Sequence, residues 1–154
     1  MGLCNQRITT GNVVKMNEKT ISQPSPLDTI NNLTAAINRG DLEAMLKLFE
    51  EDAVLVVQAL AGQPRQIARG KVAIREAYAG FVSLKPTLNR KVQEMMEAGG
   101  IALHCSRWTL KATSPDGKKI DRAGVSSDVL RKQSDGGWLI LIYNPYGISA
   151  VGFE

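Results

Sequence analysis

Histidine and cysteine are scarce in this sequence. Its 154 residues contain one histidine, His104, and two cysteines, Cys4 and Cys105. A protein-only zinc site needs about four His, Cys, Asp or Glu ligands at characteristic spacings, and neither a CxxC nor an HExxH pattern occurs. We therefore expect no metal and no cofactor. A disulfide between Cys4 and Cys105 is poorly motivated in a protein that we expect in the cytoplasm.

Long hydrophobic runs are also missing. The longest uncharged apolar stretches, such as Ala53–Val57 and Trp138–Tyr143, are far shorter than the ~20 residues of a membrane helix. The first 24 residues lack the apolar stretch of a secretory signal, and Gln6 stands where N-myristoylation requires Ser or Thr. We therefore expect a cytoplasmic protein with no membrane partner, whose residues 1–24 form a disordered N-terminal tail.

Neither basic nor acidic residues cluster strongly in any part of the sequence. There are 19 Lys and Arg against 15 Asp and Glu, a net charge of +4, and half of that excess lies in the tail. The body has no basic run interleaved with aromatic residues, so we expect no nucleic-acid partner. Apolar residues at 44% are ordinary for a globular domain. We predict a single domain over residues 25–148 and a C-terminal extension over 149–154.

Helix signals dominate the first part of the body. Ser25 followed by Pro26 and Asp28 is typical of a helix N-terminus, and Gly40 suits the left-handed end of that helix. Asp41 caps a second helix, whose apolar stripe extends to Phe49. A strand at Ala53–Val57, a short extended piece at 66–69 and a third helix at 71–83 follow.

The second part of the body predicts strands. They are expected over 88–97, 101–113, 119–132 and 138–144. Turn sequences rich in Gly, Pro, Asp and Ser separate them. Helices that precede a run of hairpin-connected strands indicate an α+β fold with an antiparallel sheet.

The hairpin around Pro115-Asp116-Gly117 predicts which side chains are neighbours. A three-residue loop with Gly117 in the left-handed conformation places His104 opposite Asp128. Opposed residues project from the same face of a sheet. The face that they share would carry His104, Ser106, Trp108, Ser126 and Asp128.

His104 beside Asp128 is a recognisable chemical unit, and we name the two as candidate catalytic residues. The carboxylate can fix the imidazole tautomer and make it a general acid or base near neutral pH. Alternatively, a buried carboxyl can stay protonated and donate to an oxyanion. The third interpretation is a structural hydrogen bond that satisfies two polar groups in the sheet.

Further polar and aromatic residues are candidates for substrate binding. They are Trp108, Tyr78, Ser106, Ser126 and Asn144. Trp108 and Tyr78 have an alternative interpretation as core aromatics. Asn144 precedes Pro145, so it either faces a pocket or forms a turn.

Several segments together resemble the SnoaL-like and ketosteroid-isomerase-like branch of the nuclear transport factor 2 superfamily. The segments are 35–42, 48–54, 69–78, 107–110, 128–133, 137–138 and 144–147. The resemblance implies a cone-shaped, cystatin-like α+β barrel, in which a curved sheet wraps around helices and a pocket. It also implies a homodimer through the outer sheet face, where Leu103, Cys105, Val125 and Val129 are expected.

The resemblance transfers function only in part. In ketosteroid isomerases a tyrosine and a protonated aspartate form the oxyanion hole, and another aspartate moves the proton. Asp128 matches the oxyanion aspartate, but Leu33 stands where the tyrosine would be, and Val56, Val57 and Gln58 offer no carboxylate base. Steroid isomerisation by that mechanism is therefore not expected.

Two functions remain open at this point. One is a protein that binds a small apolar ligand and acts on it as a cofactor-independent isomerase, dehydratase, cyclase or hydrolase through His104 and Asp128. The alternative is a non-catalytic ligand-binding or dimeric interaction module with the same fold.

Overall fold

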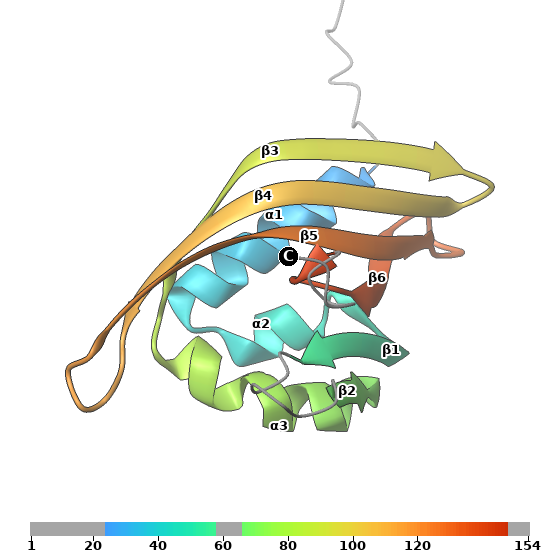
Figure 1. Ribbon diagram of the computed structural model, residues 1–154. Helices are drawn as coiled ribbons and strands as arrows, with labels where there is room; N and C mark the ends of the chain where they lie inside the picture. Colours follow the sequence, from blue (N-terminus) through green and yellow to red (C-terminus); the bar gives the residue numbers. More distant parts are fainter. Residues whose placement is uncertain (1–23, 58–65, 148–154) are drawn as a thin grey trace, which may run out of the picture.

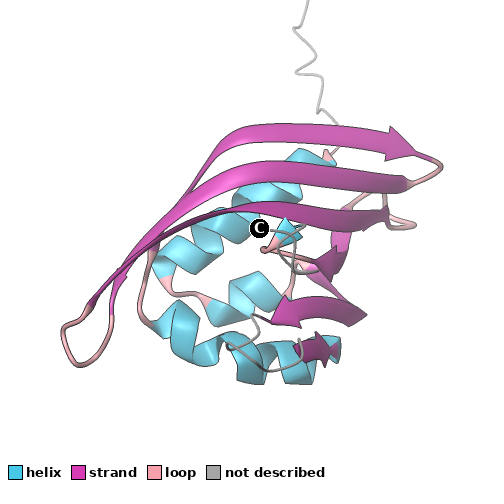
Figure 2. Ribbon diagram, in the orientation of Figure 1, coloured by secondary structure: helices cyan, strands magenta, loops and turns pink. Residues whose placement is uncertain are grey.

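The computed structural model of the chain describes residues 24–57 and 66–147. The elements are α1 (Pro26–Arg39), α2 (Leu42–Leu46), β1 (Phe49–Val57), β2 (Gln66–Arg69), α3 (Gly70–Ser83), β3 (Thr87–Ala98), β4 (Ile101–Thr113), β5 (Lys119–Lys132) and β6 (Trp138–Tyr143). The strands form one curved sheet, and the helices lie on its concave side (Figures 1 and 2). The predicted α+β cone is confirmed. The expected N-terminal tail and C-terminal extension lie outside the described residues, apart from position 24.

The first helix begins and ends where the sequence predicts. The Ser25 hydroxyl accepts from the backbone N–H of Asp28, and the Asp28 carboxylate accepts from the backbone N–H of Ser25. Together these bonds form a capping box, which satisfies N–H groups that have no partner within the helix. Gly40 ends α1 with a φ of 72°, a backbone conformation that glycine adopts without steric cost.

The second helix is shorter than predicted. It ends at Leu46, and Phe49 is the first residue of β1 rather than the last of a helical stripe. The N–H of Ile140 donates to the carbonyl of Leu48 at 2.8 Å, so the backbone is already hydrogen-bonded to the sheet at this point. Phe49 is fully buried all the same, because an apolar side chain at this point packs inward in either conformation.

The sheet is mixed rather than purely antiparallel, which corrects one expectation. Its strand order is β2-β1-β6-β5-β4-β3, and β1 pairs with β6 in parallel. All other pairs are antiparallel. A parallel pair needs a long connection between its strands, and the chain from β1 to β6 passes through α3 and four strands.

The register of the β4–β5 hairpin is the predicted one. The Ser114 N–H donates to the Lys118 carbonyl at 2.9 Å, and Gly117 has a φ of 83°. His104 lies opposite Asp128 and Ser106 lies opposite Ser126. All four of these side chains are buried on the concave side, where they lie near α1.

The core lies between the concave face and the helices. Ile30, Leu33 and Ile37 of α1, Phe49 of β1 and Ile74 of α3 are all fully buried. None of the helices in the described part of the chain combines the length and the apolar character required to cross a bilayer.

Candidate functional site

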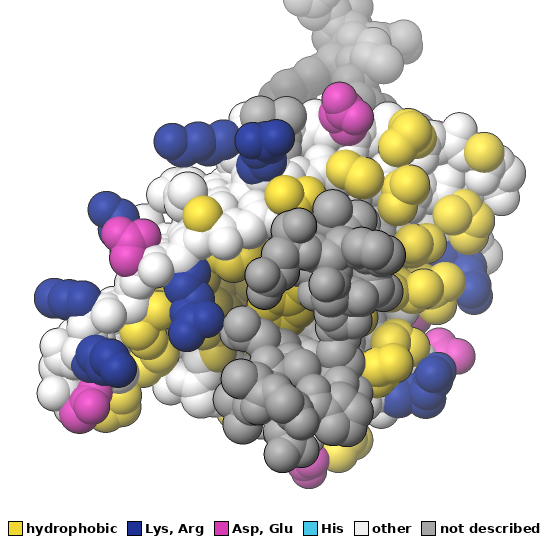
Figure 3. Space-filling view, viewed as in Figure 1, with side chains coloured by type: hydrophobic (Ala, Val, Ile, Leu, Met, Phe, Trp, Pro, Cys, Tyr) yellow, Lys and Arg dark blue, Asp and Glu magenta, His cyan; other side chains and the backbone are white. Residues whose placement is uncertain are grey.

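A cavity lies between the sheet and helices α1 and α3. Its volume is about 280 Å³, close to the lower end of the range for small-molecule pockets. Most of the wall is apolar and includes Ile37, Phe81, Leu88, Leu110 and Ile120. The polar side chains of the lining are Tyr78, Arg90, Trp108, Arg122, Tyr143 and Tyr146. Figure 3 shows hydrophobic side chains in the centre of the view.

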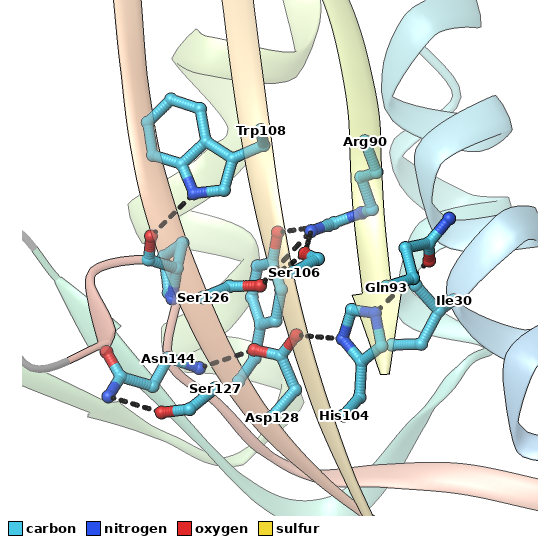
Figure 4. A network of polar contacts seen from close by, with 12 residues as sticks. Ile30, Arg90, Gln93, His104, Ser106, Trp108, Ser126, Ser127, Asp128 and Asn144 are labelled. Carbon is cyan, nitrogen blue, oxygen red and sulfur yellow. Dashed lines mark hydrogen bonds and ion pairs between the residues drawn. The ribbon is translucent and has the colours of Figure 1, made fainter. Parts of the chain in front are cut away.

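Arg90 makes four hydrogen bonds to described residues. Its Nε donates to the Thr34 hydroxyl at 2.9 Å, and one terminal nitrogen donates to Ser106 at 3.2 Å and to Ser126 at 3.4 Å. The other terminal nitrogen donates to the Tyr143 hydroxyl at 3.0 Å. These bonds join α1, β4, β5 and β6 around one guanidinium, so the arginine is held in a single orientation at the cavity wall. Figure 4 shows the bonds to Ser106 and Ser126.

A bulge in β3 lets Arg90 and Gln93 share this face. Arg90 lies opposite Trp108, but Val92 lies opposite Arg107, so Lys91 is an extra residue in the strand. Without the bulge, strict alternation would send either Arg90 or Gln93 outward. With it, both residues project from the concave face.

Burial and neighbouring charges act on the titratable groups of the cavity. Burial raises the pKa of Tyr78 well above its ordinary value, with added repulsion from Tyr143 and Tyr146. Burial likewise raises the pKa of Tyr143, although Arg90 opposes that shift. Both phenols are therefore protonated near neutral pH. For Arg90, burial disfavours the charge, but Tyr143 and Asp128 outweigh it, so the pKa of Arg90 is raised.

Trp108 forms one wall of the cavity. Its indole N–H donates to the carbonyl of Pro145 at 2.8 Å. The ring lies against the backbone of Gly124, its registered partner on β5. A Cβ added at Gly124 would be only 2.5 Å from the Trp108 ring, so glycine is what permits this close approach.

His104 and Asp128 are in direct contact, as the register predicts. His104 Nδ1 and Asp128 Oδ2 are 2.9 Å apart, and both side chains are completely buried. His104 Nε2 lies 3.2 Å from Gln93 Oε1, and Asp128 Oδ1 accepts the backbone N–H of Asn144 at 3.0 Å. A polar chain thus runs from β3 across β4 and β5 to the end of β6 (Figure 4). Neither His104 nor Asp128 belongs to the cavity lining.

Asn144 forms a turn. Its side-chain amide donates to the Ser127 hydroxyl and to the Gly147 carbonyl, and its amide oxygen accepts the N–H of Tyr146. The turn carries Pro145 and Tyr146, which do line the cavity. Asp128 therefore helps to hold a cavity wall in place through the backbone of Asn144.

The structure divides the predicted site residues into two groups. Trp108 and Tyr78 line the cavity. His104, Asp128, Ser106, Ser126 and Asn144 do not, although both serines bind the cavity residue Arg90. Their predicted roles in catalysis and substrate binding stay predictions.

Sequence reasoning missed Arg90 and Tyr143. A usable signal existed for Arg90, because it follows the buried Leu88 by two residues and should share its face. Tyr143 ends the last strand, two residues after Leu141. Strict alternation from the buried Trp138 and Ile140 would place Tyr143 on the outer face, and a register shift between β5 and β6 turns it inward instead.

Metal chemistry finds no support in the described part of the chain. Within residues 24–57 and 66–147, no three His, Cys, Asp or Glu side chains lie close enough together to hold a metal ion.

Comparisons with solved structures agree with the fold. A nuclear transport factor 2-like protein from Salmonella enterica is 23% identical, with a TM-score of 0.67 over 82% of this chain and 92% of that one. A ketosteroid isomerase-like protein from Erwinia carotovora is 21% identical, with a TM-score of 0.66 over 76% and 88%. A nuclear transport factor 2-like protein with a cystatin-like fold from Novosphingobium aromaticivorans is 17% identical, with a TM-score of 0.59 over 75% of each chain. At these identities the likeness concerns the fold alone.

Sequence comparison identifies the family. A search of curated protein sequences found no match to this chain. The profile of the SnoaL-like domain, in contrast, matches residues 30–138, which span most of the described domain. The chain belongs to the SnoaL-like family.

Proposed function

We propose that this protein binds a small, largely apolar molecule in the cavity between the sheet and helices α1 and α3. The observation that carries the proposal is the cavity itself, an apolar space of about 280 Å³ with a few polar groups at its wall. That combination is typical of ligand pockets. The SnoaL-like family supports it, because its members are often ligand-binding proteins or isomerases and dehydratases.

A cofactor-independent enzyme is the second candidate. The contact of His104 with Asp128 at 2.9 Å favours it, and so does the similarity of fold to a ketosteroid isomerase-like protein. Both residues lie two positions along their strands from the serines that bind Arg90. An acid/base role requires that the bound ligand reach the imidazole, whereas a positioning role does not.

One titration tests both candidates. The neutral apolar probe naphthalene is added to the full chain, and binding is followed by tryptophan fluorescence, since Trp108 lines the cavity. The NMR signals of the imidazole are recorded in the same series, and they are unambiguous because His104 is the single histidine. We expect saturable binding with one site per chain and little change at His104. A large, saturable change at His104 would favour the enzyme.

A matched pair of variants locates the binding site. Leu110→Trp puts a larger side chain into the cavity wall and should weaken naphthalene binding at least about ten-fold, a loss of ~1.4 kcal/mol. Leu103→Trp makes the same change on the same strand at an outward position that is 37% exposed, and should leave binding unchanged. Absence of saturable binding, or equal affinity in both variants, would overturn the proposal.

A further inference from the structure

The polar groups in the cavity wall are all suited to donating hydrogen bonds. The lining contains two arginines, three tyrosines and one tryptophan, but no Asp, Glu or His among the described residues. The Trp108 N–H is already donated to the Pro145 carbonyl. The described part of this lining offers a ligand a guanidinium and hydroxyl groups, and it contains no carboxylate that could bind a cationic ligand.

Arg90 has no carboxylate of its own among the described residues. The guanidinium donates there to four hydroxyl groups, those of Thr34, Ser106, Ser126 and Tyr143. Hydroxyl groups accept hydrogen bonds from a guanidinium, but they do not cancel its charge. A buried cation normally has a paired anion, so this arrangement leaves room for an anion that comes from outside the chain.

The tyrosines beside Arg90 can complete such an anion site. The Tyr143 hydroxyl accepts from Arg90, and its own hydrogen has no acceptor among the described residues. The Tyr78 hydroxyl makes no hydrogen bond within that part of the chain. Since burial raises the pKa of both phenols, each remains an O–H donor at neutral pH. The two rings are in edge-to-face contact, with centroids 6.3 Å apart.

Other charged groups near the cavity do not satisfy Arg90. Asp128 acts on it electrostatically, but its two oxygens are occupied by His104 and by the N–H of Asn144. Arg122 is a second arginine of the lining. An incoming carboxylate would therefore meet the guanidinium of Arg90, which Asp128 does not contact through a hydrogen bond.

We propose that the ligand of this cavity is a small apolar carboxylate, with its carboxylate group on Arg90 and the hydroxyls of Tyr143 and Tyr78. The inference rests on the proposed function and adds the chemical class of the ligand. Bonds between a guanidinium and a carboxylate are charge-assisted and stronger than neutral ones. The apolar wall takes the remainder of the molecule, and the small volume restricts it to compact ligands.

Three probes that differ only in their polar group test this inference. Cinnamate, cinnamamide and cinnamylamine share one apolar body and carry an anionic, a neutral and a cationic group. We expect cinnamate to bind about ten- to a hundred-fold more tightly than cinnamamide in isothermal titration calorimetry. Cinnamylamine should bind most weakly. Equal affinities for cinnamate and cinnamamide would overturn the inference that the ligand is a carboxylate. If naphthalene still bound, the proposal of an apolar binding pocket would remain valid.

Variants assign the preference to Arg90. Arg90→Gln should abolish the difference between cinnamate and cinnamamide, while Arg107→Gln, at an exposed position of β4, should preserve it. Tyr143→Phe should reduce the preference in part. Because Arg90→Gln removes several buried bonds, its folding is checked by circular dichroism, and the three probes on the unaltered protein decide the question if that variant unfolds. Loss of the preference in Arg107→Gln, or its survival in a folded Arg90→Gln, would contradict the assignment.

Discussion

At the level of single residues, two networks of polar side chains lie on the concave face of the sheet. One centres on Arg90, which lines the cavity, and the other on His104 and Asp128, which are completely buried. The Ser106–Ser126 contact at 2.8 Å lies between them, one row of the sheet away from each. The first network can meet a ligand directly, and the second acts on the cavity through the Asn144 turn. We therefore treat His104 and Asp128 first as positioning residues.

The effects of replacing His104 and Asp128 on the free energy of unfolding should be strongly non-additive. Removing one partner alone, in His104→Leu or Asp128→Leu, leaves a buried polar group without its partner, and we expect a loss of about 3–5 kcal/mol in each case. The double variant should lose much less than the sum of the two, because residues in contact are not additive. Unfolding in urea, followed by circular dichroism, measures all three.

An exposed pair on the same two strands provides the control. Lys111 and Asp121 are registered partners whose charged atoms are 3.8 Å apart, and both are largely exposed. Replacing them with Ala, singly and together, should show a coupling below about 1 kcal/mol. Additive losses at His104 and Asp128 would contradict the role given to their contact.

The contrast between His104 and Arg90 explains how much of the site the sequence predicts. His104 and Asp128 lie on two long strands joined by a short turn, so local turn geometry determines their pairing. The hydrogen bonds of Arg90 extend to α1 and β6 as well as to the neighbouring strands. Those contacts depend on how distant segments pack, and no local pattern encodes them.

At the level of elements, the β4–β5 hairpin shapes the cavity through Trp108 and Gly124. A methyl group at Gly124 would lie 2.5 Å from the indole, and the rigid ring would have to move. Gly124→Ala should therefore weaken the Trp108–Pro145 bond and lower the free energy of unfolding by about 1–3 kcal/mol. Urea unfolding measures this loss, and the affinity for naphthalene should change with it.

Gly80 offers a matched control for that variant. It lies in α3, and a Cβ at this position would meet nothing within 4 Å. Gly80→Ala should leave the cavity unchanged and stabilise the helix by up to about 1 kcal/mol. If Gly124→Ala were as stable as the unaltered protein, the close packing of the indole on β5 would not be what shapes this wall.

The elements also show where prediction from sequence ends. Capping residues and turn glycines are local, and they correctly predict both ends of α1 and the β4–β5 turn. The parallel pairing of β1 with β6 joins segments that are more than eighty residues apart. Nothing near Phe49 in the sequence indicates that this residue begins β1 rather than continuing α2.

On the scale of the whole molecule, the two faces of the sheet carry different side chains. The concave face holds the core, the cavity and the buried networks. The outer face carries an apolar row that crosses four strands, in which Met96 pairs with Leu103, Leu103 with Val129, and Val129 with Ile142. Figure 3 shows hydrophobic side chains on the right of the view, where these strands end in Figure 1.

Exposure of this row favours contact with a second copy of the chain. Met96 is 52% exposed, Leu103 37% and Ile142 36%, and contiguous apolar patches on a protein surface commonly mark interaction sites. A two-fold contact brings the same patch of both copies together. Glu94 and Arg107 are exposed on the same face and make no ion pair among the described residues, so each can meet its opposite in the other copy.

The predicted homodimer can be tested by placing one charge in the row. Sedimentation velocity at micromolar concentrations should show a dimer for the unaltered protein and a monomer for Leu103→Lys, because two buried lysines would face each other without partners. Val72→Lys introduces the same charge on α3 at a position that is 72% exposed, and should leave the dimer intact. A monomer for the unaltered protein would reject the dimer, whereas dissociation by both variants would place the interface elsewhere. If dimerisation is lost in Leu103→Lys while naphthalene still binds, the two faces of the sheet act independently, as the separation of the cavity from the outer row implies.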